Sequence, residues 1–350
     1  MNTYFKFLVI AISAFAIISC SSDDDNPQPV IPDGDYFNGV LILNEGGSAG
    51  GSVSFLGTDQ QEVMNDIFAD ANDGQGPGLF LQSIFFDSEK AYIIAGGSDL
   101  ISVVNRYTFE LIEEIDLDLQ NPRYGVAFDG KAYVTNSGEF ESDPNDPKDD
   151  FVAVIDLETL NVDITIPVGL IAERIVESNG QIFIQNGSFG SGNTISKLNP
   201  MSNTITETLE VGEGINSIQV YNQKLYALDS EGVKQIDLAT FSVETEINKP
   251  DALTSVSNLR IENDQFYYTS GTAAYTTSIS STELSSEVIF DYGSDSSFGA
   301  FRGFEVNEGQ IYVGDAGDFT SNGFVFIYSL EGQLVKEFSV GISPNSFYFQ

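Results

Sequence analysis

Short apolar runs alternate with polar turns along most of the chain, and one phrase recurs. It joins a turn, a Lys or Gln, an apolar residue and an aromatic residue, as in "DGKAYV", and the other copies read "SEKAYI", "NGQIFI", "NQKLYA", "NDQFYY" and "EGQIYV". The aromatics, 41, 50, 43, 41 and 45 residues apart, are Tyr92, Tyr133, Phe183, Tyr226, Tyr267 and Tyr312. A period in the forties, built of short runs rich in Val, Ile, Thr and Tyr, predicts four-stranded propeller blades.

Each repeat unit has the pattern of two hairpins. The strand "YGVAF" is followed by the Asp129-Gly130 turn, whose residues tolerate positive φ, and by the returning strand "KAYVT". Two more strands follow, as in "FVAVIDLETLNVDITI" at 151–166. Asn-Gly, Asp-Gly and Glu-Gly turns inside the units argue against helical repeats of similar length. Because blades are packed on both faces, the recurring aromatic is predicted to fill the space between neighbouring blades.

The ends of the chain supply the two parts of one further blade. Six full units run from about residue 80 to 341, "NGVLILNEGG" at 38–47 resembles a second strand without its first, and "PNSFYFQ" at 344–350 resembles a first strand without its second. Joining them removes the unpaired edges of an open array. The sequence therefore predicts an all-β fold over residues 37–350: a seven-bladed β-propeller with four-stranded antiparallel blades, closed by the N- and C-terminal strands in one blade.

Residues 1–19 have the three parts of a secretory signal peptide. A short basic start precedes an apolar run at 7–18, which is too short to span a bilayer, and the run ends in "IISC". This ending resembles the lipobox of bacterial lipoproteins, whose Cys is acylated and becomes the mature N-terminus, and it implies that Cys20 carries lipid. An ordinary signal peptide with a chance Cys is the alternative.

Residues 20–36 are acidic and Pro-rich, and they predict a solvated tether. The "SSDDD" after the Cys resembles the surface-export signal of lipoproteins from the Bacteroides and Flavobacterium group. This resemblance implies a protein anchored in the outer membrane and facing the cell exterior.

The composition narrows the possible functions. With 52 acidic against 14 basic side chains, the net charge of −38 repels phosphate backbones and anionic lipid, which excludes nucleic-acid binding and leaves the lipid as the only membrane attachment. The chain has no His and one Cys, which excludes His-based triads, thiol nucleophiles, the usual zinc ligands and His-ligated haem. Only carboxylates, Tyr and Lys remain for acid–base chemistry, and we predict no catalytic residue, metal site or cofactor. Oxygen-ligated calcium is the one metal that this composition leaves open.

Four loops are predicted to share one rim, because the innermost strand of a blade begins on the face where the second strand ends. They are residues 44–51, 136–150, 186–193 and 315–323, and the acidic 136–150 loop has the character of a lid or a solvated insertion. Four of the five arginines precede the aromatic of their unit by ten, nine, seven and ten residues, and are predicted to open innermost strands around the channel: Arg123, Arg174, Arg260 and Arg302. Gln82, Asn216 and Asn345 hold roughly matching positions in other units.

A ring of guanidinium groups suits a ligand rich in hydrogen-bond acceptors, because each group offers five fixed donors and stays charged. We predict that aromatic side chains beside the ring stack on a flat ligand, and that polar rim residues complete the site. The aromatics are Tyr124, Phe189, Phe301 and Phe319, and the polar residues are Asn44, Glu45, Asn136, Asn216 and Asp315. In the alternative, the arginines pair with rim carboxylates such as Glu45, Asp315 or Asp318 and tie loops together, while the aromatics only pack.

Three stretches carry a resemblance to known families. "AYVTN" at 132–136 resembles the motif of the YVTN-type, YncE-like propellers. "LILNEGG" near the start and "YVGDAGDFTSNGFVFIYSLEGQLVKEFSVGISPNSFYF" at the end, together with the leader, resemble surface lipoproteins of the DUF5074 type and of the BtuG kind. The resemblance implies a non-catalytic protein that captures cobalamin or another corrinoid as cargo and passes it to a TonB-dependent outer-membrane transporter.

Two other functions stay open. The first is a calcium-dependent, lactonase-type propeller hydrolase with Glu45, Asp315 and Asp318 as metal ligands. These acids lie in scattered loops, and "DPNDPKDD" lacks the glycine-centred spacing of a calcium loop. The second is a surface-layer or adhesion scaffold without a small ligand. Arginines that converge on an open site favour capture, whereas arginines saturated by carboxylates favour the scaffold.

Overall fold

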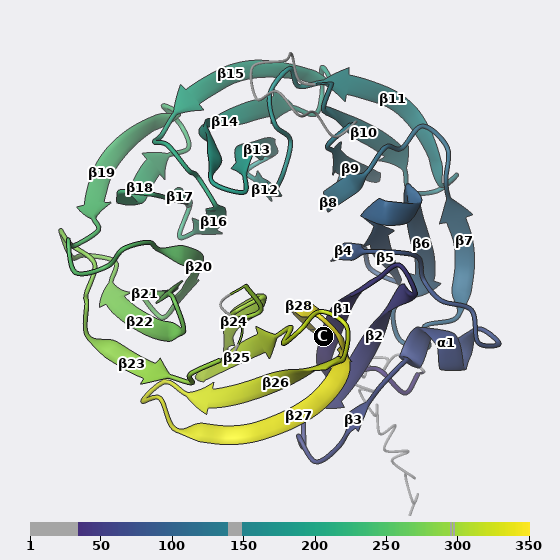
Figure 1. Cartoon of the computed structure of the whole chain (residues 1–350). Coiled ribbons are helices and arrows are strands. Elements are labelled where there is room, and N and C mark those ends of the chain that lie inside the picture. The colour runs from purple at the N-terminus through teal and green to yellow at the C-terminus, as the bar shows by residue number, and fades with distance from the viewer. Residues whose placement is uncertain (1–33, 139–148, 295, 297) are drawn as a thin grey trace, which may run out of the picture. The chain divides into compact units, whose positions relative to one another are not determined.

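Seven four-stranded sheets stand in a ring about a central axis (Figure 1). The computed structural model describes residues 34–138, 149–294, 296 and 298–350. Every pairing between neighbouring strands of these sheets is antiparallel, so the predicted seven-bladed β-propeller is confirmed. Residues 1–33, with Cys20 and the signal peptide, and residues 139–148 of the acidic loop lie outside the described part. Within that part, no helix is long and apolar enough to cross a membrane.

Six blades each use four consecutive strands, which follow one another in chain order from the innermost strand outwards. The blades are β4 Leu81–Phe86, β5 Lys90–Ala95, β6 Leu100–Asn105 and β7 Leu111–Ile115; β8 Pro122–Phe128, β9 Lys131–Asn136, β10 Phe151–Asp156 and β11 Asn161–Pro167; β12 Ile175–Ser178, β13 Gln181–Ser188, β14 Ser191–Asn199 and β15 Thr204–Glu210; β16 Ser217–Tyr221, β17 Lys224–Asp229, β18 Gly232–Asp237 and β19 Ser242–Asn248; β20 Ser257–Glu262, β21 Gln265–Ser270, β22 Ala273–Ser278 and β23 Val288–Asp291; and β24 Gly303–Asn307, β25 Gln310–Asp315, β26 Asn322–Ser329 and β27 Leu334–Ile342.

The seventh blade joins the two ends of the chain. Its strands are β28 Pro344–Phe349, β1 Gly39–Gly47, β2 Gly50–Gly57 and β3 Val63–Met64. β28 pairs with β1 in antiparallel register, from Val40 opposite Phe349 to Asn44 opposite Pro344. The predicted closure is therefore confirmed, and the edges of both terminal strands are paired. The short helix α1 (Ile67–Ala71) follows β3, and a single 3-10 turn, η1 (Gly96–Ser98), follows β5.

The recurring aromatics are packing residues, as predicted. All six lie on the second strand of their blade, and none is more than 4% exposed. Tyr133 shares an apolar cluster with Ile175 and Ile182 of the next blade. Tyr226 meets Phe266 of the next blade edge to face, with ring centroids 5.5 Å apart. The repeated aromatic position in the sequence therefore corresponds to the interface between neighbouring blades, where large rings contribute much of the buried apolar surface.

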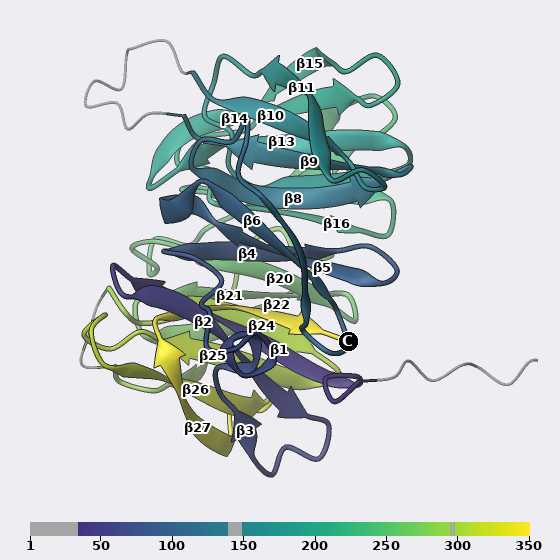
Figure 2. The ribbon, with the colours of Figure 1, turned by 90° about the vertical axis from the view of Figure 1, so that its right-hand side faces the viewer.

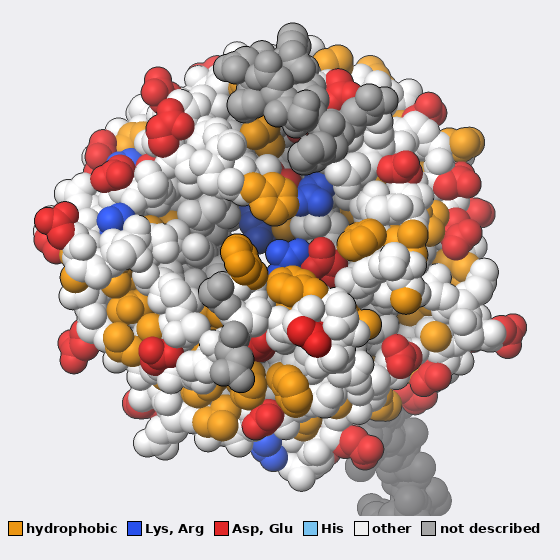
Figure 3. All heavy atoms as spheres, in the orientation of Figure 1, with side chains coloured by type: hydrophobic (Ala, Val, Ile, Leu, Met, Phe, Trp, Pro, Cys, Tyr) orange, Lys and Arg blue, Asp and Glu red, His pale blue; other side chains and the backbone are white. Residues whose placement is uncertain are grey.

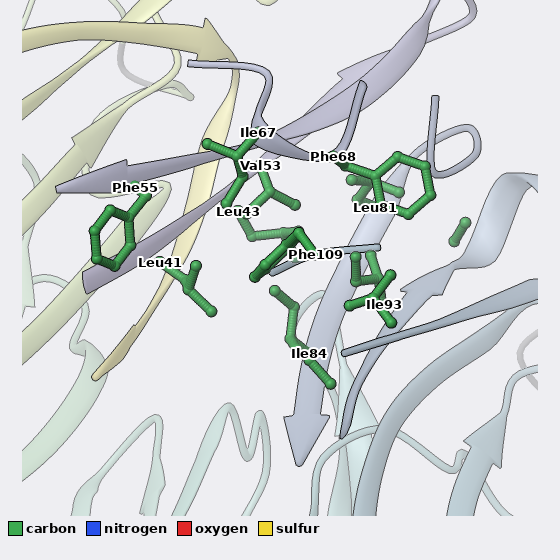
Figure 4. Close-up of a cluster of buried hydrophobic side chains, with 13 residues drawn as sticks. Leu41, Leu43, Val53, Phe55, Ile67, Phe68, Leu81, Ile84, Ile93 and Phe109 are labelled. Carbon is green, nitrogen blue, oxygen red and sulfur yellow. The ribbon is translucent and has the colours of Figure 1, made fainter. Parts of the chain in front are cut away.

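An apolar cluster joins the closing blade to the blade of β4 and β5 (Figure 4). α1 adds Ile67 and Phe68 to this cluster, and both side chains are buried. Tyr36 falls within the predicted tether, yet its ring packs edge to face against Phe55 and Phe109, with centroids 5.5 Å apart in both contacts. The ordered fold therefore begins no later than Tyr36.

The two faces of the ring differ in the loops and chain ends that lie on them. We call front the face turned to the viewer in Figure 1, where the loops before innermost strands and after second strands lie, and back the opposite face. Figure 2 shows the C-terminus at the back face. Tyr36 is held there too, because Gln350 donates from its side chain to the carbonyl oxygen of Tyr36 at 3.1 Å. Tyr36 and the C-terminal strand β28 therefore meet at the back face.

The seam between β28 and β1 is expected to carry a large share of the stability. Phe347 on β28 is 5% exposed and packs 5.7 Å from the Tyr312 ring. Replacing it by Ala leaves a cavity between the closing blade and the blade of β24–β27, so we expect the free energy of unfolding in urea to fall by about 3–5 kcal/mol. Phe189→Ala, at a side chain that is 92% exposed, is the control and should change it by less than about 0.5 kcal/mol. Equal effects of the two variants would contradict a closed ring.

Candidate functional site

Three of the four candidate arginines lie where an innermost strand begins on the front face, as predicted. Arg123 is the second residue of β8, Arg174 immediately precedes β12, and Arg302 immediately precedes β24. Arg260 is different, and the prediction that it opens its strand is wrong. It lies within β20, directly opposite Tyr267, because only seven residues separate the two and the antiparallel register then fixes its height. It therefore lies deeper along the axis.

Basic side chains gather at the hollowed centre of the front face, with hydrophobic side chains beside them (Figure 3). The strongest contact in this region is a two-pronged ion pair between Arg123 and Glu173. The Arg123 Nε and Nη2 atoms donate to Glu173 Oε2 and Oε1 at 3.0 and 2.8 Å. Both side chains are mostly buried, with 14% and 11% of their surface exposed. The pair links the blade of β8 to that of β12.

Two further ion pairs also cross from one blade to the next. Arg302 donates from Nε and Nη2 to Oε2 of Glu45, at 2.9 and 2.5 Å, and Ser343 donates to the same oxygen at 2.9 Å. Arg260 donates from Nε to Oε2 of Glu305 at 2.6 Å. Guanidinium and carboxylate groups in such geometry form strong, charge-assisted hydrogen bonds. Three of the four arginines are therefore engaged by the protein itself.

Arg174 is the fourth, and it has no carboxylate partner among the described residues. Its guanidinium carbon lies 4.8 Å from the centre of the Tyr124 ring, in a cation–π contact. In residues 34–138, 149–294, 296 and 298–350, no side chain or carbonyl accepts a hydrogen bond from this guanidinium. The stacking covers one face of the group and leaves the N–H donors at its edge for another acceptor.

Polar and aromatic groups hold the surroundings of Arg174 in place. Gln82 donates to the Tyr124 hydroxyl at 2.8 Å, and the Tyr348 hydroxyl accepts the backbone N–H of Ile84 at 2.8 Å. Burial raises the pKa of Tyr348 to about 12, so this phenol is neutral at physiological pH. Burial lowers the pKa of Arg174, but the neighbouring Tyr124 and Glu173 outweigh it and hold that pKa above its ordinary value. The guanidinium is therefore charged at physiological pH.

These side chains form what we call the charged opening: four guanidinium and three carboxylate groups at the axis. Its members are Arg123, Arg174, Arg260, Arg302, Glu45, Glu173 and Glu305. The three ion pairs leave one positive charge without a partner in this set. That charge stands out in a chain whose net charge is −38.

Several other candidate residues serve the local structure. Asn136 is fully buried, accepts the backbone N–H of Gln120 at 2.9 Å and donates to the carbonyl of Val134 at 2.9 Å. Asn44 is buried and donates to two serine hydroxyls, and Asp315 accepts a backbone N–H of its own turn. Asn136 and Asp315 are the last residues of their second strands, whereas Asn44 lies inside β1 and holds the neighbouring strand β2. The sequence signal for this role is a polar residue at or near the end of the second strand, as in "AYVTN". Asn216 likewise donates to the carbonyl of Val256, at 3.2 Å.

The candidate aromatics divide into two groups. Phe301 is 4% exposed and packs among Phe290, Tyr292 and Phe304, so its ring is not available to a ligand. Tyr124 stacks on Arg174. The other two candidate rings face solvent, since Phe189 is 92% and Phe319 38% exposed. Sequence reasoning missed three more exposed rings of the front face: Phe80, Phe298 and Phe324.

The acids of the calcium alternative do not form one group. Glu45 is paired with Arg302, Asp315 is 7% exposed, and Asp318 accepts backbone N–H groups of its own turn at 2.9 and 2.7 Å. In the part of the chain that the structure describes, no three His, Cys, Asp or Glu residues are placed to hold a metal ion. The geometry at the axis suits binding through hydrogen bonds and charge.

Comparison with known proteins extends the picture. A family model described as "Domain of unknown function (DUF5074)" matches residues 38–349. No curated protein matches the chain significantly. Among solved structures, the chain is similar to a quinonprotein alcohol dehydrogenase-like protein from Bacteroides thetaiotaomicron, with 14% identity, a TM-score of 0.68 and coverage of 90% of this chain and 78% of that one.

Two other solved structures are similar to a comparable extent. A functionally unknown protein from Desulfotomaculum acetoxidans is 12% identical, with a TM-score of 0.65 and coverage of 89% of this chain and 98% of that one. BamB from Moraxella catarrhalis is 16% identical, with a TM-score of 0.52 and coverage of 88% and 84%. At these identities the similarity shows the fold alone.

The ion pair between Arg123 and Glu173 gives a stability test. Glu173→Gln leaves a mostly buried guanidinium without its counter-charge, so we expect the free energy of unfolding in urea to fall by about 2–3 kcal/mol. Adding Arg123→Met should recover part of this loss, giving a coupling energy of at least about 1 kcal/mol in the double-mutant cycle. The control, Asp163→Asn, breaks the exposed ion pair with Lys131 and should leave the midpoint nearly unchanged. If Glu173→Gln is as mild as the control, the pair is not structural.

Proposed function

Because the chain belongs to the DUF5074 family, a family defined without a known function, we propose from the site that the protein is a non-catalytic capture protein. In this proposal, a small ligand rich in hydrogen-bond acceptors binds at the charged opening on the front face. The observation that carries the proposal is Arg174, a permanently charged group whose edge has no acceptor among the described residues. Such a group is unfavourable unless water or a ligand satisfies its donors.

The position of the opening supports binding without chemistry. The three ion pairs hold neighbouring blades together around the axis, and the Tyr124 ring supports one face of Arg174. The guanidinium is therefore held ready before a ligand arrives, and little ordering is needed on binding. Rings beside the opening add flat apolar surface, on which a ring system can stack.

The finer part of the proposal rests on the resemblance of the two chain ends and the leader to surface lipoproteins of the BtuG kind. We propose that Cys20 carries a lipid anchor in the outer membrane, that the protein faces the cell exterior, and that it passes cobalamin or another corrinoid to a TonB-dependent transporter.

A surface scaffold without a small ligand is the second candidate, and one observation favours it. Three of the four guanidinium groups are satisfied by carboxylates, as expected if their task is to hold neighbouring blades together. The two functions differ over Arg174: a scaffold gains nothing from it, whereas capture depends on it.

Calorimetric titration of residues 21–350 with cobalamin tests the proposal. We expect saturable heat, and we expect Arg174→Ala to weaken binding at least about tenfold, because a charge-assisted contact is lost while the three ion pairs remain. The control is Arg106→Ala, since Arg106 also stacks on aromatic rings, Phe86 and Tyr107, but bonds to the C-terminal residue at the back face.

The outcomes separate the candidates. Absence of both heat and a shift in melting temperature with cobalamin would reject the corrinoid. Cobalamin binding that survives Arg174→Ala would place the ligand elsewhere and leave the charged opening to a scaffold role.

A further inference from the structure

The charge of the opening restricts what a ligand can be. Arg174 is the one member of the charged opening without a counter-charge, and Glu173 and Glu305 are close enough to act on it electrostatically. One oxyanion group on a ligand would balance Arg174 and accept two parallel hydrogen bonds from its edge. A second negative charge nearby would meet the two glutamates with no guanidinium left for it, and like charges at short range repel.

Three exposed phenylalanines point to the other half of the ligand. Phe80, Phe189 and Phe319 have φ of 51°, 49° and 61°, a left-handed conformation that is costly for a bulky residue and that Gly or Asn adopts more easily. Buried phenylalanines in the same conformation recover that cost by packing: Phe109, Phe241 and Phe301 are 0%, 6% and 4% exposed. The exposed three, at 46%, 92% and 38%, bury less surface and so recover much less of that cost.

These rings are also gathered on one side of the molecule. In the described ranges, five phenylalanines stand out as exposed, and all lie at loops or strand starts of the front face: Phe80, Phe189, Phe298, Phe319 and Phe324. Figure 3 shows hydrophobic side chains next to the basic ones at the centre of this face. Apolar groups held at strained positions around a charged opening are typical of a binding surface.

We propose that the ligand of the charged opening is a small organic monoanion, with a single oxyanion group bound by Arg174 and a flat apolar body lying against the front-face phenylalanines. This inference rests on the proposed capture function and narrows it. An aromatic carboxylate belongs to this class, and a corrinoid shares with it the single oxyanion group, carried by its phosphodiester. Polyanions are excluded, since the opening offers one uncompensated charge inside a strongly acidic protein.

A matched set of naphthalene probes tests the charge rule. Titrations of residues 21–350 at neutral pH compare naphthalene-2-carboxylate with the neutral naphthalene-2-carboxamide and the doubly charged naphthalene-2,6-dicarboxylate. We expect the carboxylate to bind at least about tenfold more tightly than the amide, since only it forms charge-assisted hydrogen bonds, and more tightly than the dicarboxylate. Methyl 2-naphthyl phosphate, in a parallel arm, tells whether a phosphodiester or a carboxylate is preferred.

Two variants assign the effect to named side chains. Arg174→Gln should abolish the preference for carboxylate over amide while leaving weak binding of both. Phe189→Ser should weaken carboxylate and amide alike, whereas Met201→Ser, at a side chain that is 82% exposed in a turn between outer strands, should not. A carboxylate that binds no better than the amide, or a preference that survives Arg174→Gln, overturns the inference.

The result can be separated from that for the capture function. Arg174-dependent cobalamin binding without the charge preference among the probes would reject the monoanion rule and leave capture standing. Charge-dependent binding of the probes without cobalamin binding would support the monoanion rule and reject the corrinoid.

Discussion

The antiparallel pairing of β28 with β1 is the constraint on which the rest of the structure depends. It completes the seventh blade from opposite ends of the chain and removes the two edges that an open array of strands would expose. It also sets the geometry at the axis. Glu45, at the end of β1, meets Arg302, 257 residues away in the sequence, only because the ring is closed. The charged opening is therefore a product of the closure and not of any one blade.

The opening combines stability and function in one set of side chains. Each of its three ion pairs crosses between neighbouring blades and so holds innermost strands together around the axis at which Arg174 also lies. A fourth pair would have completed this arrangement. Instead, Arg174 is supported by a ring face, which keeps it positioned and charged without consuming its donors. The exposed phenylalanines of the front face are similar in this respect, because three of them adopt an unfavourable left-handed backbone conformation without being buried.

The sequence was sufficient for the fold because the repeat is a packing signal. Each unit buries its aromatic at the blade interface, and the two half-units at the chain ends pair with each other. The candidate site could be predicted from the sequence only in part. The number of residues between an arginine and the aromatic of its blade indicates where along the propeller axis the arginine lies. This count placed Arg123 correctly, and the shorter count for Arg260 would have placed that residue deeper. Nothing in one repeat indicates that Glu173 turns to Arg123 of the preceding blade and not to Arg174 beside it. The sequence also did not indicate which aromatic side chains are exposed. Phe301 and Phe319 both lie in front-face loops, but only Phe301 is buried, by the rings around it.

A crystal structure of residues 21–350 without ligand, at neutral pH, tests the central claim most directly through the surroundings of four guanidinium groups. The account predicts a carboxylate within ion-pair distance of Arg123, Arg260 and Arg302, and none from the protein within that distance of Arg174. A protein carboxylate seated on the edge of Arg174 would contradict it, because the opening would then be fully balanced and would have no charge to offer a ligand.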